Sequence, residues 1–290
     1  MAELGGFRDA AAEQRYRTAY QAALREWPDY TSHTVPTSFG TTQYYRSGRP
    51  DGMPVVLLPG ANSAAPSWAS IVRLLGDHRP VIALDTIGDA GLSVQTRPVR
   101  NGAEYASWLA EVLDTLDLPL VHLVGLSYGG WLALNQAIHR PDALATVSAI
   151  EPARALAGLA PTALIRMVYV SLRDSDELRR RFLRWSGCGT EPATPLRELQ
   201  IAGLRDYRKR ATPMPQKLSD AQLAAIRVPT LVMLGGRSRL HNSKRANARA
   251  RLHIPNVSTV GFPTASHALP SEFSAETARR LLAFMATHPG

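Results

Sequence analysis

The feature that most constrains this chain is a short motif, Gly125-x-Ser127-x-Gly129, which separates an apolar run from an Ala/Leu-rich run. Residues 120–124 read as a buried strand, and residues 131–138 read as a helix. A serine in the tight turn between them has strained backbone, and only residues without a Cβ fit two positions to either side. The new helix directs its N-terminus at the hydroxyl oxygen, where it stabilises negative charge. The motif therefore predicts a nucleophile elbow with Ser127 at its corner.

Short apolar runs alternate with helical patterns on both sides of this motif. Such alternation indicates crossover units and a mostly parallel sheet. An antiparallel pair of strands comes first in the chain, at residues 31–36 and 41–46. The further predicted strands are residues 54–58, 80–84, 120–124, 144–150, 229–234 and 257–262.

The alternation lapses at about residues 153–223, which are mostly helical in pattern. We interpret this stretch as a cap inserted over the carboxyl edge of the sheet, where open α/β sheets bind ligands. With 290 residues and 45% hydrophobic composition, the chain can bury one large core. The prediction is a single domain, 1–290, with an N-terminal helix at 7–27 and a core formed by 28–152 and 224–290.

Composition excludes several classes of protein. No run approaches about 18 uncharged apolar residues, so no membrane span is expected. The N-terminus has no apolar block after a basic start, and therefore does not read as a secretory signal. The one cysteine, Cys188, fits a reducing cytoplasm and leaves no second thiol for a metal site. We accordingly predict a cytoplasmic protein that uses no metal and no other cofactor.

The formal charge is +9, and the basic residues gather in one part of the chain. Residues 221–271 contain no Asp or Glu. This stretch is either a solvated basic face or, at 237–251, a docking face for an acidic carrier protein. Nucleic acid is a poorer fit, because no aromatic residues interleave with the charges. The basic residues of 221–271 are Arg227, Arg237, Arg239, Lys244, Arg245, Arg249 and Arg251.

Four stretches resemble the α/β-hydrolase fold family, most closely its bacterial single-domain members with an N-terminal helix and a helical cap. They are Leu-Leu-Pro-Gly-Ala-Asn at 57–62, Asp-Thr-Ile-Gly-Asp-Ala-Gly-Leu-Ser at 85–93, the elbow, and Ala-Ser-His-Ala-Leu-Pro at 265–270. The similarity covers nearly the whole chain. It implies a mostly parallel central sheet with helices on both faces and an inserted helical cap.

Acyl-transfer chemistry needs a nucleophile, a base, a group that orients the base, and donors for the oxyanion. The resemblance assigns the nucleophile to Ser127 and the base to His267, which follows the predicted strand 257–262. The oxyanion donors would be the backbone amides of Tyr128 and Ala61.

Two departures from the family pattern concern the supporting groups. Relatives commonly have His-Gly where this chain has Pro59-Gly60, so one side-chain hydrogen bond that braces the loop is missing. In most relatives an aspartate follows the strand corresponding to residues 230–234. Here Ser238 and Asn242 occupy those places, and no carboxylate is available in the stretch.

Glu151 is the best replacement for the missing acid, because it directly follows the predicted strand beside the elbow strand. The alternative is that Glu151 is a surface glutamate in a turn, which would leave a Ser-His dyad with no acid and a reduced rate. Pro152 favours extended backbone at Glu151. Asp89 is an alternative acid, whereas Asp85 is expected to brace its own loop.

Three functions remain open at this point. The first is a serine hydrolase acting on an ester, thioester or lactone. The cap and the aromatic residues Trp68, Trp131, Tyr128 and Trp185 would then line an apolar acyl pocket, although each of these aromatic residues taken singly is more typical of the core. The second is a non-hydrolytic cyclase, lyase or acyltransferase acting on a biosynthetic intermediate. The third is a non-catalytic ligand-binding protein on the same scaffold.

Overall fold

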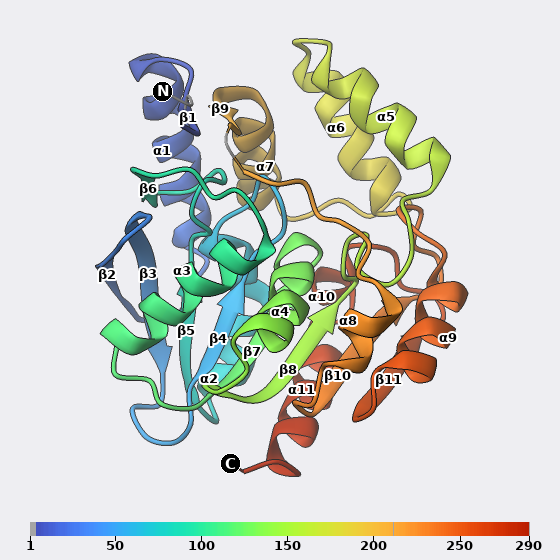
Figure 1. The fold of residues 1–290 in the computed structure, drawn as a ribbon. Helices are drawn as coiled ribbons and strands as arrows, with labels where there is room; N and C mark the ends of the chain where they lie inside the picture. Colours follow the sequence, from blue (N-terminus) through green and yellow to red (C-terminus); the bar gives the residue numbers. More distant parts are fainter. Residues whose placement is uncertain (1–3, 211, 290) are drawn as a thin grey trace.

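A twisted, mostly parallel sheet forms the centre of the molecule (Figure 1). The computed structural model describes residues 4–210 and 212–289. In that part of the chain nine strands lie in the order β11-β10-β8-β7-β4-β5-β3-β2, and β6 pairs with β3. The strands from β11 to β5 are parallel to their neighbours, whereas β3 pairs antiparallel with β2, β5 and β6. The predicted fold class is therefore confirmed. The strands are β2 (Tyr30–Thr37), β3 (Gly40–Gly48), β4 (Val55–Leu58), β5 (Pro80–Leu84), β6 (Val94–Gln95), β7 (Val121–Leu126), β8 (Leu144–Ile150), β10 (Thr230–Gly235) and β11 (Val257–Phe262).

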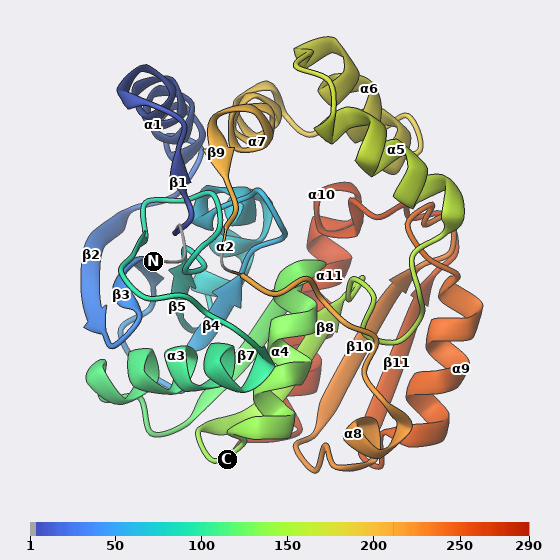
Figure 2. The same cartoon turned by 45° about the horizontal axis from the view of Figure 1, so that its top comes forward.

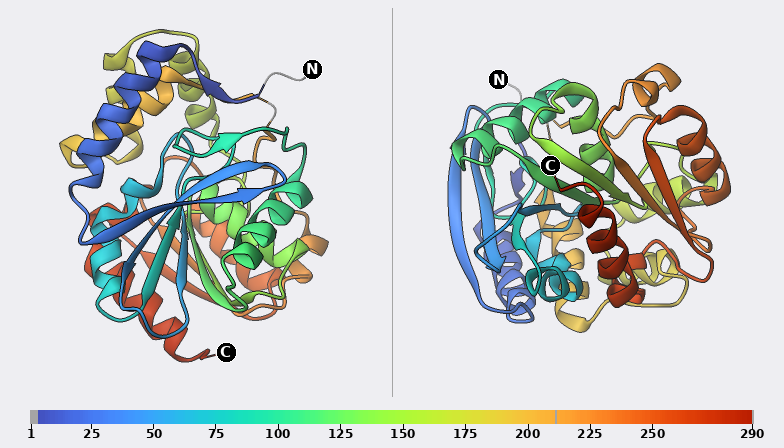
Figure 3. Two further views of the ribbon diagram at one scale, coloured as in Figure 1. Left: turned by 90° about the vertical axis from the view of Figure 1, so that its left-hand side faces the viewer. Right: turned by 90° about the horizontal axis from the view of Figure 1, so that it is seen from below.

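Helices cover both faces of this sheet. Side chains of α3, α4, α8 and α9 join the core on one face, and those of α1, α2 and α11 join the core on the other. The view from below shows α11 and α3 on opposite sides of the strands (Figure 3, right). These helices are α1 (Ala10–Leu24), α2 (Ala69–Gly76), α3 (Gly102–Thr115), α4 (Tyr128–His139), α8 (Asp220–Ala224), α9 (Ser243–His253) and α11 (Ser274–Ala286). The short helices η1 (Ala65–Trp68) and α10 (Leu269–Glu272) precede α2 and α11.

The strand β4 shows why the central strands read as continuous apolar runs. Val56 and Leu58 pack into the core on one face of the sheet, while Val55 and Leu57 pack into the core on the other. Because successive side chains alternate between faces, a strand covered on both sides must be apolar at every position. All four side chains are fully buried.

Residues 153–223 separate β8 and β10, which are neighbours in the sheet. This inserted segment contains α5 (Pro161–Ser171), α6 (Asp176–Ser186), α7 (Thr194–Asp206), β9 (Tyr207–Arg208) and α8. The N-terminal segment joins it, because β1 (Gly6–Phe7) pairs antiparallel with β9 and α1 packs against α7. Figure 2 shows α1, α7, α5 and α6 grouped at one end of the molecule, beyond the ends of the strands. No helix in the described ranges combines the length and apolar character needed to cross a bilayer.

A buried carboxylate, Asp85, holds α1 to the sheet. It accepts hydrogen bonds from the Tyr20 hydroxyl and from the backbone amides of Ala65 and Leu92, at 2.7–3.1 Å. Burial raises the pKa of Asp85 to about 6, although these three hydrogen bonds pull it downward. Asp85 therefore braces its loop, as the sequence predicts, and the charged form depends on its donors.

Replacing Tyr20 with Phe tests this arrangement. We expect Tyr20→Phe to lower the free energy of unfolding by about 1.5–3 kcal/mol at pH 8, where Asp85 is ionised. The loss should be smaller at pH 5, because Asp85 is then largely protonated in the folded state. Thermal unfolding at the two pH values measures both effects.

Tyr16→Phe is the matched control. Tyr16 is as buried as Tyr20 and lies one turn earlier in α1, but its hydroxyl has no hydrogen-bond partner within the described residues. Its removal should leave stability unchanged or slightly raised. Equal losses for the two variants would show that the bond to Asp85 does not anchor α1.

Candidate active site

The elbow places Ser127 on a sharp corner between β7 and α4. The strand ends at Leu126 and the helix begins at Tyr128, three residues earlier than the sequence pattern indicates. Ser127 has φ 54° and ψ −109°, a conformation that a residue with a side chain rarely adopts. Its amide donates to the Ile150 carbonyl at 2.8 Å, and its carbonyl accepts from the Trp131 amide at 3.0 Å. Backbone bonds to β8 and α4 therefore hold the strained residue.

The two flanking glycines are required by close backbone contact. A Cβ on Gly125 would lie 2.0 Å from the Gly129 carbonyl oxygen, and a Cβ on Gly129 would lie 2.1 Å from the Leu58 carbonyl oxygen. Both obstacles are backbone atoms that cannot rotate away. The steric reason for the motif's spacing is thus visible in the fold.

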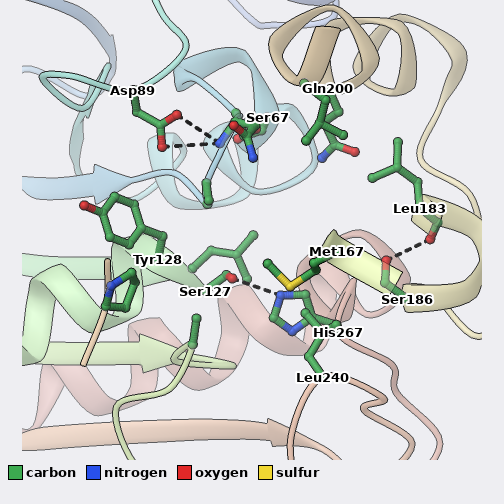
Figure 4. A pocket seen from close by; sticks show the side chains of 18 of the residues that line it. Ser67, Asp89, Ser127, Tyr128, Met167, Leu183, Ser186, Gln200, Leu240 and His267 are labelled. Atoms are coloured by element: carbon green, nitrogen blue, oxygen red, sulfur yellow. Dashed lines mark hydrogen bonds between the residues drawn. The ribbon is translucent and has the colours of Figure 1, made fainter. Parts of the chain in front are cut away.

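His267 lies between β11 and α10, and its ring reaches Ser127. Nε2 is 3.0 Å from the Ser127 Oγ, and Nδ1 is 2.9 Å from the Glu151 Oε2 (Figure 4 shows the first contact). The structure therefore brings together three residues that are 24 and 116 positions apart in sequence. Each follows a strand of the same sheet: Ser127 follows β7, Glu151 follows β8, and His267 follows β11.

The Glu151 carboxylate is fully buried and accepts four hydrogen bonds. Oε1 accepts from the Gly235 amide at 2.7 Å, and Oε2 accepts from the Ser238 hydroxyl at 2.5 Å. The His241 Nε2 at 3.1 Å and the His267 Nδ1 at 2.9 Å complete the set. Burial raises the pKa of Glu151, but the hydrogen bonds of the two histidines outweigh it and lower the pKa to about 2.

The charge of Glu151 decides the tautomer of His267. An ionised carboxylate only accepts hydrogen bonds, so Nδ1 of His267 must carry the proton. Nε2 is then free to accept from the Ser127 hydroxyl. This is the tautomer that a general base needs at a serine.

One expectation about Glu151 is wrong. Pro152 led us to expect extended backbone, but Glu151 has φ 48°, in the left-handed region. The Glu151 amide donates to the Met233 carbonyl at 2.9 Å, and the left-handed turn directs the side chain back across the end of β10. The tertiary bonds override the local preference of the residue before proline.

The loop after β10, where the resemblance led us to expect an acid, carries hydrogen-bond donors instead. Ser238 and His241 both bond to Glu151, whereas Asn242 caps α9 by accepting from the Arg245 amide at 2.9 Å. Sequence reasoning did not single out His241. The available signal was a serine and a histidine three residues apart in a loop that lacks acids, which suits a carboxylate arriving from a neighbouring strand. The His241 Nδ1 is buried with no partner in the described chain.

Ala61 and Tyr128 both line the cavity beside Ser127. Asp89, the alternative acid, bonds elsewhere: it accepts from the Asn62 amide at 3.1 Å and pairs with Lys209 at 2.6 Å. Asn62 has φ 55°, so this carboxylate holds a left-handed turn next to Ala61. Asp89 thus supplies a brace for the loop that contains Pro59-Gly60. The Lys209 ammonium also lies 5.5 Å from the centre of the Tyr128 ring.

A cavity of about 550 Å³ opens at Ser127 and His267, between the sheet edge and the inserted segment (Figure 4). Most of its wall is apolar, with Met167, Leu183 and Leu240 among the side chains around the two residues. Asp89 and Lys209 provide a paired polar patch.

The expected aromatic lining is wrong for three of the four residues named. Of the four, Tyr128 alone is among the described residues that line the cavity. Trp68 packs in the core beneath the sheet, and Trp131 stacks on Tyr128 while its Nε1 donates to the Gln216 carbonyl at 2.9 Å. Trp185 lies against the guanidinium groups of two arginines instead.

Glu151, His241 and His267 bring three ligand-type atoms within 4.8 Å of one another. They are the one such group of His, Cys, Asp and Glu residues within the ranges that the structure describes. Their hydrogen bonds to one another already account for the arrangement.

Part of the predicted basic docking face is used inside the molecule. Arg249 donates to three backbone carbonyls of the inserted segment and pairs with Asp220. Arg239 donates to the Trp185 carbonyl at 3.2 Å, and its guanidinium lies 5.9 Å from the centre of the Trp185 ring. The other basic residues of 237–251 are not used in this way within the part of the chain that the structure describes, and binding of an acidic carrier protein to this face stays a prediction.

A serine on a strand–turn–helix corner, facing a loop histidine over a mostly parallel sheet, is the arrangement of α/β-hydrolases. The model of the alpha/beta hydrolase family matches residues 55–280, so the chain belongs to this family. It is an esterase-like hydrolase, as its full-length relatives indicate.

Two relatives from Bacillus subtilis match nearly the whole chain. Carboxylesterase YbfK is 27% identical over 281 residues, which is 93% of each chain. Its crystal structure, titled carboxylesterase CesB, superposes with a TM-score of 0.90 at 24% identity and covers 96% of this chain and 99% of that one. Naproxen esterase (carboxylesterase NP) gives a TM-score of 0.90 at 25% identity, with the same coverage.

The elbow glycines allow a stability test. Gly125→Ala forces a Cβ into the backbone of α4, so we expect the free energy of unfolding to fall by at least about 3 kcal/mol. Urea unfolding followed by circular dichroism measures it. Gly261→Ala is the control, because a Cβ on Gly261 in β11 meets no atom within 4 Å. A Gly125→Ala protein as stable as the control would contradict the steric account.

Proposed function

We propose that the chain is a serine esterase that hydrolyses carboxylic esters of bulky apolar acids through Ser127. One observation carries this proposal: the unbroken chain of hydrogen bonds from the Ser127 Oγ through the His267 ring to the Glu151 carboxylate, at the wall of an apolar cavity. The names of the full-length relatives, both carboxylesterases, support the choice of an ester. Thioesters and lactones share the same acyl chemistry and remain within the proposal.

In the proposed reaction, the Ser127 Oγ attacks the ester carbonyl carbon while its proton passes to the His267 Nε2. The tetrahedral intermediate collapses when the same nitrogen returns that proton to the departing alkoxide. Water then attacks the acyl-enzyme, again losing a proton to His267, and the acid leaves as Ser127 is regenerated. Every proton transfer uses one atom, the His267 Nε2 that the Glu151 bond leaves unprotonated before the reaction. It accepts a proton in each attack and gives that proton back in each collapse, to the alkoxide first and to the Ser127 Oγ at the end.

Glu151 would act by holding His267 and by stabilising its positive charge after proton transfer. The four donors around Glu151 support this role, because they keep the carboxylate ionised although it is buried. Ser238 and His241 are then positioning residues: they touch Glu151 and not the reacting atoms.

The oxyanion would lie against the amides of Ala61 and Tyr128. Tyr128 is the first residue of α4, where amides have no partner within the helix and the helix dipole favours negative charge. The brace from Asp89 to Asn62 supports a fixed position for the neighbouring Ala61. A donor of this kind typically contributes about 2.7–4 kcal/mol to transition-state stabilisation.

Covalent labelling tests the nucleophile. A fluorophosphonate probe should modify one serine, Ser127, and Ser127→Ala should abolish labelling and lower kcat for p-nitrophenyl esters by about 10⁶. Mass spectrometry of the labelled peptide and a spectrophotometric assay measure the two effects. Ser47→Ala, which removes a surface hydroxyl bonded to the Asp29 carbonyl, is the control and should label fully.

Other outcomes point to the alternatives from the sequence. A folded protein that neither labels nor hydrolyses esters would contradict the esterase. A ligand recovered unchanged would then favour the binding protein, and activity that depends on His267 but not on Ser127 would favour a non-hydrolytic enzyme. The acidic carrier and the cytoplasmic location stay predictions.

The identity of the acid has its own test. Glu151→Gln keeps the shape but lets the amide donate to Nδ1, which selects the wrong His267 tautomer. We expect kcat to fall by about 10⁴ while KM changes little. Asp89→Asn should lower kcat by at most about 10², because it weakens the loop brace and the ion pair with Lys209 but no bond to His267. Steady-state kinetics on a small ester measures kcat and KM for both variants. A larger loss of kcat for Asp89→Asn than for Glu151→Gln would assign the acid to Asp89.

A further inference from the structure

The helix α5 exposes an apolar face that nothing in the described chain covers. Five large apolar residues, four in α5 and one at its C-cap, are 48–77% exposed, which is unusual for a contiguous set. At about 100° per residue, they span an arc of about 140° on one side of the helix. We call them the α5 outer face: Leu164, Ile165, Val168, Tyr169 and Leu172.

The opposite side of α5 is also apolar, and it belongs to the site. Ala163 and Val170 are buried there, and Met167 lines the cavity beside His267 (Figure 4). A helix that is apolar on both sides is normally covered on both sides. In Figures 1 and 2, α5 and α6 lie at the edge of the molecule, away from the sheet. The inner side of α5 reaches the cavity through Met167, whereas the outer side is exposed.

The charged residues next to the α5 outer face in the sequence are all positive. Residues 152–173 contain no Asp or Glu. Arg166 stacks on the Trp185 ring at 4.9 Å and Arg173 on the Tyr169 ring at 5.6 Å, and neither forms an ion pair within the described residues. The next acid, Asp174, is paired with Arg179 at 2.7 Å.

This charge pattern decides between two partners for the face. A second copy of the chain packed through a two-fold axis would place the same arginines against each other with no acid to match them. An anionic lipid surface offers apolar depth for the five side chains and negative headgroups for the arginines.

We propose that α5 docks the protein onto anionic lipid surfaces, lying in the plane of the interface with its outer face inserted. Esters of apolar acids partition into the same interface, and the inner face of α5 borders the cavity that would receive them. This inference rests on the proposed function for its purpose, but the docking itself does not need the reaction.

Vesicle sedimentation tests the docking. The protein should sediment with vesicles of equal parts phosphatidylcholine and phosphatidylglycerol, and the binding should weaken in high salt. Vesicles of phosphatidylcholine alone should bind at least about tenfold more weakly. Ile165→Gln combined with Leu172→Gln should lower the partition coefficient at least about tenfold.

Two control variants make the result specific. Val94→Gln with Leu252→Gln removes apolar side chains of matching exposure, 59% and 76%, from other parts of the surface. Lys244→Gln with Arg251→Gln removes two charges from α9, to be compared with Arg166→Gln and Arg173→Gln. Controls that weaken binding as much as the α5 variants would overturn the proposal. So would absence of binding to either vesicle, or a dimer in light scattering that Ile165→Gln with Leu172→Gln dissociates.

The docking and the esterase can fail separately. Ser127→Ala should bind vesicles like the unaltered protein, and the α5 variants should hydrolyse a soluble short-chain ester normally, which also shows that they fold. Hydrolysis without vesicle binding refutes only the docking. Vesicle binding without hydrolysis refutes only the esterase.

Discussion

The site depends on one buried charge, the carboxylate of Glu151. Its four donors come from two segments: Gly235 ends β10 and is followed by Ser238 and His241, and His267 follows β11. Glu151 itself follows β8, so the bonds join three loops. A buried carboxylate without donors would be strongly unfavourable, so the loops are held together by the need to satisfy it. The same bonds fix the orientation of the His267 ring toward Ser127.

The features predicted most accurately from the sequence are those that local steric contacts determine. The corner at Ser127 follows from Gly125 and Gly129, because any Cβ there would collide with backbone within a few residues or on the adjacent strand. The parallel sheet follows from apolar runs such as Val55–Leu58, which must pack on both faces. Counting carboxylates was also sufficient to show that the loop before His267 could not supply an acid.

The features that sequence reasoning missed depend on contacts between distant segments. The left-handed turn at Glu151 is set by a bond to Met233, which overrides the preference imposed by Pro152. The cavity wall depends on how the inserted segment lies over the sheet, and periodicity places Trp68 and Trp185 on helices or loops without saying what faces them. His241 was overlooked because a donor matters there only once the acceptor has moved to another strand.

Backbone strain is concentrated at this end of the sheet. Asn62, Ser127 and Glu151 are non-glycine residues with φ between 48° and 55°, and they follow β4, β7 and β8, which are adjacent strands. Each is held by a hydrogen bond to another segment: Asn62 to Asp89, Ser127 to the end of β8, and Glu151 to β10. Such conformations typically cost about 1–3 kcal/mol each, so they persist only where the surrounding structure enforces them. Because all three residues border the cavity or the groups that orient His267, we infer that the stability of the rest of the sheet sustains the geometry of the site.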